Sequence, residues 1–456
     1  MAAPMNVGHI VTLSPKKNPI TDDFRPHERS GHCCVADNSF LYSIGGIFYD
    51  PLEIMLMEEG DNYNPVFNEI WCYNISLNLW SKVSMRGHSP YLTASMSSLL
   101  SGNMIITFGG SGFPFGAESD NRVHTFNVRT HTWKTLPCTG EKPHAKYGQA
   151  MVLVHNHYLY VYGGCRRVPS GAFLFDSDLH RVSLQSLVWE KMRDPTKEKL
   201  KKNTTRSAMR KQAAFSDKDG EDVENDDEDE AGGNDDDGGG DNNDDDIGDD
   251  EEEEKDMYPL AAGSYRHHIV NDEERLYIIG GGTLWREVYP LDIIHSFSYA
   301  TSTWEILHSH GDPDHPDGFP SPRKYHTCVQ KDNDVFITGG HNGYEVFDDI
   351  WKLTLPDLQW TRLAVTLPNT LFFHAAAMTP AGCMYVFGGV CNIENNMRTA
   401  GLHRIWLYIP SLQETCWHNI LHFIPQIGSM SQEQLLALGI PRMFIDRLHW
   451  DKSVLE

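Results

Sequence analysis

Six short apolar runs, each ending in a Gly-Gly pair, recur along this chain. They are FLYSIGG ending at Gly46, MIITFGG at Gly110, YLYVYGG at Gly164, RLYIIGG at Gly281, DVFITGG at Gly340 and CMYVFGG at Gly389. Apolar and β-branched residues over about five positions are typical of a buried strand. Because glycine adopts backbone angles that other residues resist, the chain can turn sharply after each run. The pattern predicts six buried strands, each followed by a tight turn.

Two further marks keep phase with the Gly-Gly pairs. Upstream lies a position that is often His, occupied by His32, Gln149, His268, His326 and His374. Downstream, an aromatic residue or His precedes a Trp by nine positions, in the pairs Trp71 and Trp80, His124 and Trp133, His180 and Trp189, His295 and Trp304, and Trp351 and Trp360. This order of marks predicts a repeated unit of four antiparallel strands, with a period of about 50 residues.

The unit resembles the kelch repeat, and the resemblance implies an all-β fold, a six-bladed β-propeller. Blades 1–3 are expected in residues 29–190 and blades 4–6 in residues 263–410. One blade cannot bury both of its faces, so the recurring Trp, Tyr and Phe positions are predicted to pack between blades. The in-phase histidines are predicted to make a repeated structural hydrogen bond.

The last unit lacks its downstream Trp, because Thr415 stands nine residues after Trp406. The sixth blade is therefore expected to lack a fourth strand of its own. The apolar stretch HIVTLS at residues 9–14 is the candidate to supply that strand. Residues 1–28 are interpreted as an N-terminal segment that closes the ring.

The charge is concentrated in one segment. The chain has 38 Lys+Arg and 63 Asp+Glu, a formal net charge of −25. Residues 216–257 contain 24 Asp or Glu against Lys218 and Lys255 and account for −22 of it. Low hydrophobicity with blocks of like charge does not offset ordering entropy, so residues 191–262 are predicted to be a disordered insertion, basic at first and then acidic.

Composition excludes several classes of function. A nearly neutral remainder does not favour a nucleic-acid groove, and no apolar run is long enough for a membrane helix. Nine cysteines without a CxxC pair, and a start without a secretory signal, indicate reduced thiols in a soluble protein of the cytoplasm, the nucleus or both. No metal or other cofactor is expected.

Beyond the last blade, residues 411–456 have a helical pattern. Ser411 with Glu414, and Ser431 with Gln434, are capping-box signatures. Leu412, Cys416 and Ile420 share one helical face. Farther on, a second apolar face carries Ile440, Phe444 and Leu448, with Pro441 in a first-turn position. Two or three short amphipathic helices are predicted.

Together these two faces resemble an elongin-binding box (Ser411, Leu412, Cys416, Ile420) followed by a cullin-2 box (Ile440, Pro441, Phe444, Leu448). With the propeller, they make the chain similar to the kelch-repeat substrate receptors of cullin-2–elongin B/C ubiquitin ligases. The resemblance implies elongin C with elongin B and cullin 2 as partners. It also implies clients whose C-terminal degrons, often ending in glycine, bind in the propeller pocket.

A terminal carboxylate favours arginine donors, so the expected pocket contains arginines of the rim where strand one starts and strand two ends. Aromatic residues of the same rim would wall the pocket. The candidates are Arg29, Arg166, Arg167, Arg266, Arg286, Arg323, Trp285, Tyr265, Tyr325 and Tyr344.

Two other classes remain as alternatives. A scaffold that binds signalling or cytoskeletal partners would have the same propeller but no elongin binding. An enzyme would need ligands that converge on the propeller axis, and the in-phase histidines are the candidates for them. No nucleophile and base pair is evident in the sequence, and the protein is expected not to be an enzyme.

Overall fold

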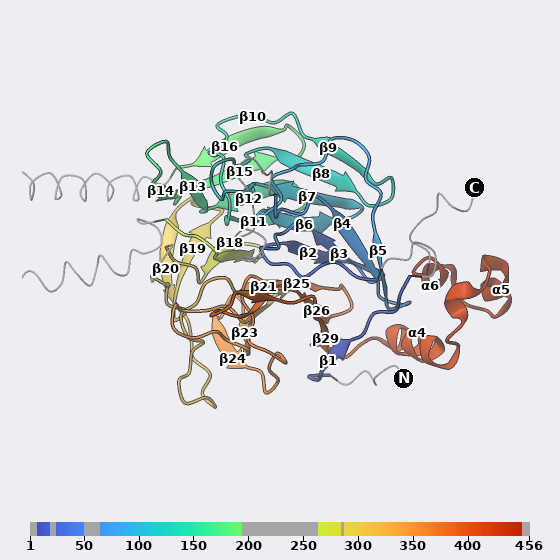
Figure 1. Ribbon diagram of the computed structural model, residues 1–456. Coiled ribbons are helices and arrows are strands. Elements are labelled where there is room, and N and C mark those ends of the chain that lie inside the picture. The colour runs from blue at the N-terminus through green and yellow to red at the C-terminus, as the bar shows by residue number, and fades with distance from the viewer. Residues whose placement is uncertain (1–6, 19–23, 50–63, 194–262, 284–286, 449–456) are drawn as a thin grey trace, which may run out of the picture.

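A computed structural model describes residues 7–18, 24–49, 64–193, 263–283 and 287–448. These residues form six antiparallel sheets arranged in a ring, with a group of short helices at one side (Figure 1). The six-bladed propeller is therefore confirmed. Nearly all of the predicted insertion, and the candidates Trp285 and Arg286, lie outside the described residues.

Blades 1 to 5 each contain four antiparallel strands from one continuous stretch of chain, and every predicted Gly-Gly pair follows the second strand of its blade. The strands of blades 1–3 are β2 (Cys33–Ala36), β3 (Phe40–Ile44), β4 (Ile70–Asn74) and β5 (Leu79–Lys82); β6 (Ser97–Ser101), β7 (Met104–Phe108), β8 (Val123–Asn127) and β9 (Thr132–Thr135); and β11 (Ala150–Val154), β12 (Tyr158–Tyr162), β15 (Leu179–Ser183) and β16 (Val188–Met192). The strands of blades 4–6 are β17 (His268–Asn271), β18 (Arg275–Ile279), β19 (Ile293–Ser298) and β20 (Trp304–His308); β21 (Thr327–Lys331), β22 (Asp334–Thr338), β23 (Ile350–Thr354) and β24 (Gln359–Arg362); and β25 (Ala375–Met378), β26 (Cys383–Phe387) and β29 (Leu402–Trp406).

Blade 6 takes its fourth strand from the start of the chain. Strand β1 (Ile10–Leu13) pairs antiparallel with β29, so that Ile10 faces Ile405 and Leu13 faces Leu402. The sheet order is β1-β29-β26-β25. This pairing is the one expected from the missing Trp of the last repeat, and it closes the ring with residues from both ends of the propeller.

Six of the hydrophobic clusters in the described residues each join two neighbouring blades. Trp80, Trp189 and Trp360, from the predicted Trp positions, are fully buried in these clusters. The predicted packing of aromatic residues between blades is confirmed. A blade can bury its apolar faces only by packing against the neighbouring blades, so each blade depends on the rest of the ring for its stability.

Several small elements were not predicted. Strand β10 (Thr139–Gly140) pairs parallel with β16, which itself continues two residues into the predicted insertion. Two short ribbons, β13 (Cys165–Arg167) with β14 (Phe173–Phe175) and β27 (Val390–Asn392) with β28 (Met397–Arg398), follow Gly-Gly pairs. The rim that carries the Gly-Gly pairs is called the upper face here, and the opposite rim the lower face.

The tail forms helix α4 (Leu412–Phe423), the 3-10 turn η1 (Ile427–Ser429), helix α5 (Gln432–Ala437) and helix α6 (Arg442–Ile445). The predicted caps are present: Ser411 accepts a hydrogen bond from the Glu414 backbone N–H, and Ser431 with Gln434 forms a complete capping box. The tail packs beside β1 at the side of the disc opposite the β13–β14 ribbon, on the lower face (Figure 1).

No helix in the described part of the chain has the length and apolar character that spanning a membrane requires.

Candidate functional site

An axial cavity of about 470 Å³ runs between the innermost strands of all six blades. Strands β2, β6, β11, β17, β21 and β25 line it. Towards the upper face, the cavity ends at the six residues that precede these strands: Gly31, Ser95, Gly148, Arg266, Tyr325 and Phe373. We call these six residues the axial ring.

The axial ring is closed by backbone hydrogen bonds, one between each pair of neighbouring blades. The N–H of Ser95 donates to the Gly31 carbonyl at 2.8 Å, and the N–H of Gly148 donates to the Ser95 carbonyl at 2.8 Å. The same bond continues through Arg266, Tyr325 and Phe373, and the N–H of Gly31 donates to the Phe373 carbonyl at 3.0 Å to complete the circuit. The ring therefore fixes its side chains at the centre of the disc.

All six ring residues have positive φ, between 53° and 65°. Glycine occupies this region freely, but Arg266 at 57° and Tyr325 at 58° hold it at a cost of about 1–3 kcal/mol each. Residues in strained backbone conformations concentrate at binding and active sites. Arg266 and Tyr325 thus occupy positions where a glycine would have less backbone strain.

The Arg266 side chain reaches across the axial ring. Its guanidinium donates to Ser95 Oγ of blade 2 and lies 4.5 Å from the Phe373 ring of blade 6. It also lies 5.5 Å from the Tyr265 ring and 6.0 Å from the Tyr325 ring. Among the described residues, no carboxylate pairs with Arg266, and its buried Nε has no hydrogen-bond partner. Arg266 is a cation that keeps donors for an anion.

Aromatic side chains surround this cation on the upper face. Tyr147, Tyr265, Tyr325 and Phe372 form one buried cluster, and Phe373 packs against it. Burial raises the pKa of Tyr265 and Tyr325 above the ordinary value, so both phenols stay neutral. An arginine in an aromatic surround has the chemistry to bind a carboxylate with little competition from water.

Of the ten predicted pocket residues, Arg266 and Tyr325 line the axial cavity. Tyr265 lies beside them, whereas Arg166 and Arg167 lie on the β13 ribbon. Tyr344 is 81% exposed on a rim loop. The structure therefore brings together three of the predicted residues, leaves Arg166, Arg167 and Tyr344 at the rim, and buries Arg29 and Arg323 inside their blades.

Two predicted arginines have structural roles instead. Arg29 and Arg323 are fully buried, and each one pairs with an acid that precedes β4 or β23, Glu69 at 2.6 Å and Asp349 at 2.9 Å. Each guanidinium also donates to the carbonyl of the first Gly of its Gly-Gly pair, Gly45 or Gly339. With their donors used inside the blade, these two side chains are not available to a ligand, and their assignment to the pocket was wrong.

The in-phase histidines also differ from the prediction at one place. The rings of His32, His267, His326 and His374 pack on the first glycine of the preceding blade's Gly-Gly pair, so His267, not His268, is the repeat position. His268 faces the cavity and bonds the His326 carbonyl at 3.1 Å. The His-His doublet caused this shift of one residue. Within the described ranges, no group of three or more His, Cys, Asp or Glu could hold a metal ion.

The prediction of a hydrogen bond repeated by the histidines at this position is wrong for three of them, because the ring nitrogens of His32, His267 and His326 are buried without a hydrogen-bond partner among the described residues. Gln149 and His374 do form one. Gln149 donates to the Phe108 carbonyl at 2.7 Å, and His374 Nε2 lies 2.8 Å from Thr338 Oγ1. Burial lowers the pKa of His267 and His374 to about 3, so both rings are neutral at pH 7. These histidines stabilise the contact between blades.

A second candidate surface lies on α4. Leu412 is 78% exposed, Phe423 is 77% exposed and Cys416 is exposed between them, whereas Ile420 is half-buried. Ile409, just before the helix, is 87% exposed. The outward face of α4 thus presents an apolar stripe that no other described residue covers, the usual form of a helix that binds in a groove of another protein.

The residues of the predicted cullin-2 box are placed differently. Ile440, Phe444 and Leu448 are buried with Trp417, Ile427 and Leu435 in the core of the tail. Only Pro441, the N-cap of α6, is exposed. A direct contact between the three buried side chains and a partner is not compatible with this packing. The exposed apolar residues nearby are Leu436, Leu438 and Met443.

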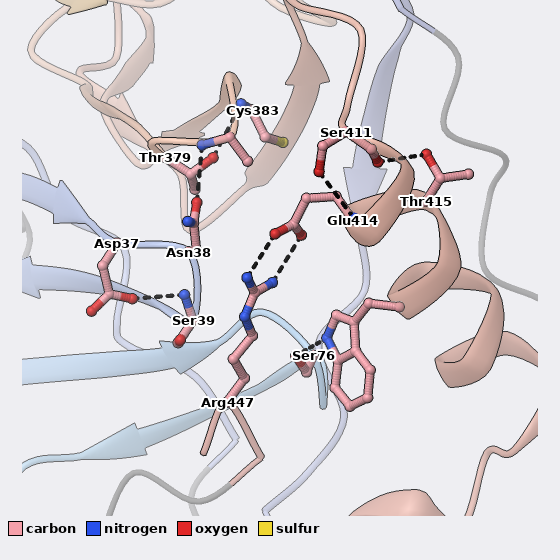
Figure 2. A network of polar contacts seen from close by, with 12 residues as sticks. Asp37, Asn38, Ser39, Ser76, Thr379, Cys383, Ser411, Glu414, Thr415 and Arg447 are labelled. Carbon is pink, nitrogen blue, oxygen red and sulfur yellow. Dashed lines mark hydrogen bonds and ion pairs between the residues drawn. The ribbon is translucent and has the colours of Figure 1, made fainter. Parts of the chain in front are cut away.

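An ion pair within the tail and two hydrogen bonds with blade 1 hold the tail on the lower face. Glu414 and Arg447 form a two-pronged ion pair, with distances of 2.6 and 2.8 Å, between the first turn of α4 and the chain after α6 (Figure 2). Trp417 Nε1 donates to Ser76 Oγ at 3.1 Å, and Asn74 donates to the Arg447 carbonyl at 3.1 Å. The outward face of α4 is therefore fixed relative to the propeller.

Sequence reasoning missed the axial ring and these tail contacts. A usable signal for the ring was present, because its residues stand fourteen or fifteen positions before the first glycine of each Gly-Gly pair, as from Gly31 to Gly45 and from Arg266 to Gly280. The ion pair of Glu414 with Arg447 joins residues 33 positions apart and has no such signature.

The comparisons with known proteins agree with this fold. The family model described as the KLHDC2/KLHL20/DRC7 Kelch-repeats domain matches residues 7–215 and 253–432. Kelch domain-containing protein 10 of Xenopus laevis is 38% identical over 426 residues, which cover 93% of this chain and 86% of that protein. The Homo sapiens protein of the same name is 37% identical, with coverage of 93% and 80%. The Drosophila melanogaster homolog is 31% identical, with coverage of 93% and 62%.

Proposed function

The chain belongs to the kelch-repeat family of kelch domain-containing protein 10, and we propose that it is the substrate receptor of a cullin-2–elongin B/C ubiquitin ligase. In this role it binds the C-terminal degron of a client on the upper face and recruits the ligase through the tail. The observation that carries the proposal is the exposed apolar face of α4, with Leu412 and Cys416 at the positions of an elongin-binding box.

Elongin C is the partner proposed for this face. Leu412 and Phe423 are both more than three-quarters exposed. Burying each of these large side chains against a partner can contribute about 2 kcal/mol to the free energy of binding. The helix is already capped by Ser411 and held by Glu414, so little ordering entropy opposes binding. Cullin 2 would then contact the exposed tail residues Leu436, Leu438 and Met443 rather than the buried residues of the box.

Co-purification of the full chain with elongin B/C and cullin 2 tests this proposal. We expect the wild type to bind elongin B/C and the double variant Leu412→Ala/Cys416→Trp to bind at least about 30-fold more weakly. The alanine removes the Leu412 anchor, and the tryptophan is too large for the groove of elongin C. Gln413→Ala, an exposed polar neighbour on the same helix, is the matched control. A wild-type chain that captures neither elongin B/C nor cullin 2 would leave the scaffold alternative in its place.

Arg266 is the proposed anchor for the client's terminal carboxylate. It is the cation at the centre of the axial ring, and the bulky rings of its neighbours Tyr325 and Phe373 favour a terminal residue without a large side chain. A glycine terminus fits this requirement, since its backbone can approach the ring closely.

Arg266→Gly separates the binding role from the structural one. Glycine occupies the same ring position in blades 1 and 3, so the variant relieves backbone strain while it removes the guanidinium. In fluorescence anisotropy with a pool of glycine-ended peptides, we expect affinity to fall by about 10- to 100-fold, with a melting temperature near that of the wild type. The wild type should also prefer free acids to C-terminal amides.

Arg167→Gln, an exposed rim arginine on β13, is the control and should bind the peptides as the wild type does. Equal affinity of Arg266→Gly and wild type for the free-acid peptides would exclude Arg266 as the anchor. That result would not affect the elongin experiment, which depends on α4 alone.

A further inference from the structure

A second cavity, of about 750 Å³, lies between the tail and the lower face of the propeller. Its roof is the inward side of α4, with Trp417, His418 and Leu421. Its floor and walls come from β1, from the turns of blades 6 and 1, and from β29. This volume is within the range of small-molecule sites in proteins, about 300–1,000 Å³. We call it the junction cavity.

The junction cavity contains a guanidinium without a counter-charge. Arg404 lies on β29 between Val11 of β1 and Tyr385 of β26, on the side of the strand that faces blade 1. Among the described residues, no carboxylate forms an ion pair with Arg404. Glu414 is the acid in the cavity lining, and both of its oxygens are used by Arg447.

The other ionisable groups of the lining add no negative charge. Lys16 stands at the β1 side, and His418 and His422 project from α4. Burial, with the nearby charge of Arg404 and then of His422, lowers the pKa of His418 to about 4. At neutral pH its ring is therefore uncharged, and the cavity as a whole is cationic.

The remaining lining is mainly aromatic and aliphatic. Tyr73, Tyr385, Trp406 and Trp417 contribute large ring surfaces, and Leu13 adds an aliphatic one. Trp406 is 8% exposed, and its buried indole N–H has no hydrogen-bond partner among the described residues. An unsatisfied buried donor costs about 1–3 kcal/mol and indicates a site where an acceptor belongs.

We infer that the junction cavity is a binding site for a small amphipathic carboxylate, an organic acid with an aromatic or aliphatic body. Arg404 would hold the carboxylate in fork geometry, and the rings of Tyr73, Tyr385 and Trp406 would cover its apolar part. The excess of positive charge selects against neutral and cationic molecules of the same shape. This inference concerns the lower face and stands whether or not the proposed function is correct.

The position of the site has a structural consequence. Helix α4 presents Leu412 and Phe423 outward and Trp417, His418 and Leu421 to the cavity. A ligand in the junction cavity would therefore contact the inward face of the helix that carries the apolar stripe. Because it binds only when α4 is docked on the propeller, it would stabilise the docked tail.

Calorimetric titration of the full chain with 1-naphthylacetate and with 1-naphthylacetamide tests the site. The two probes have nearly the same shape and differ in charge. We expect the wild type to bind the acid at least about tenfold more tightly than the amide, and Arg404→Gln to lose that preference. Arg129→Gln, an exposed arginine on the β8–β9 turn of blade 2, should behave as the wild type.

Ala381→Trp is the second variant, because it fills the cavity from the turn between β25 and β26 without changing its charge. It should abolish binding of both probes. Should the wild type bind neither probe, or should Arg404→Gln and Ala381→Trp both bind the acid as the wild type does, the site assignment is wrong. If Arg404→Gln fails to fold, the result for Ala381→Trp decides alone.

Discussion

Replacing Arg323 by methionine should lower the free energy of unfolding by about 3 kcal/mol, because it leaves the largely buried carboxylate of Asp349 without its cation. Arg323 is fully buried and donates through Nη2 to Asp349 at 2.9 Å, through Nη1 to the Gly339 carbonyl and through Nε to the Ser321 carbonyl. Methionine has a similar length but no donors. Chemical denaturation followed by Trp fluorescence measures the change.

The double variant Arg323→Met/Asp349→Asn is the control for this mechanism. If the loss comes from the stranded charge, removing that charge should recover part of the stability, and the cycle should give a coupling of at least about 1 kcal/mol. Additive losses in the two single variants would contradict it. Arg129→Gln, an exposed arginine on a blade-2 turn, should change stability by less than about 0.5 kcal/mol.

The same pair gives a pH dependence of known sign. Burial opposes ionisation of Asp349, but the hydrogen bonds and charge of Arg323 outweigh it and hold the pKa of Asp349 below its ordinary value. Its stabilising contribution is complete above the unfolded-state pKa of about 4 and is lost as the pH falls through the folded-state value. The difference in stability between wild type and Arg323→Met should narrow below about pH 4.

The fold was predictable because its marks recur at constant phase. Each blade repeats a Gly-Gly pair after strand two, and the Trp of strand four fills the space between blades, as Trp80 and Trp189 do. Even the closure could be read from the chain, since Thr415 stands where a sixth Trp was due. Repetition supplies several copies of one signal, so a single irregular blade does not hide it.

The site was less predictable, because arginines of one rim have two roles that look alike in sequence. Arg29 and Arg323 form ion pairs with acids that lie 40 and 26 residues later in the chain, and only the fold brings each pair together. A signal existed: both acids stand two residues before a Trp, as Glu69 before Trp71 and Asp349 before Trp351, and bond its indole N–H. Arg266 does not share this position: it stands in the axial ring with Gly31 and Tyr325, two residues after the position of Arg29 and Arg323, which Ser264 occupies in blade 4.

The tail illustrates a different limit. Helical periodicity identifies which residues share an apolar face, but not whether the face meets a partner or the protein's own core. Leu412 and Cys416 remained outside, whereas Ile440 and Phe444 became the core of the tail. Three short helices need some buried residues of their own to fold, and the second box supplies them.

Ring closure by β1 leads to the second large effect. Ile10 packs against the cluster between blades 5 and 6, and Leu13 against the cluster between blades 6 and 1. Thr12 Oγ1 also lies 3.1 Å from His403 Nδ1, and the Gly8 N–H donates to the Trp406 carbonyl at 2.9 Å. The four residues of β1 thus contribute to both interfaces of blade 6, the one with blade 5 and the one with blade 1.

Deleting residues 1–14 should destabilise the protein by about 4–6 kcal/mol, from lost apolar burial and ladder hydrogen bonds, and lower the melting temperature by about 5 °C or more. It would also leave β29 as an unpaired edge, which favours aggregation on heating. Calorimetry of the full chain and of the deletion measures the shift, with deletion of residues 1–6 as the control that retains β1.

A synthetic peptide of residues 7–18 should restore part of the melting temperature, because the groove beside β29 is preformed by β26 and the rest of blade 6. An unchanged melting temperature after the longer deletion would mean that packing between blades closes the ring without β1.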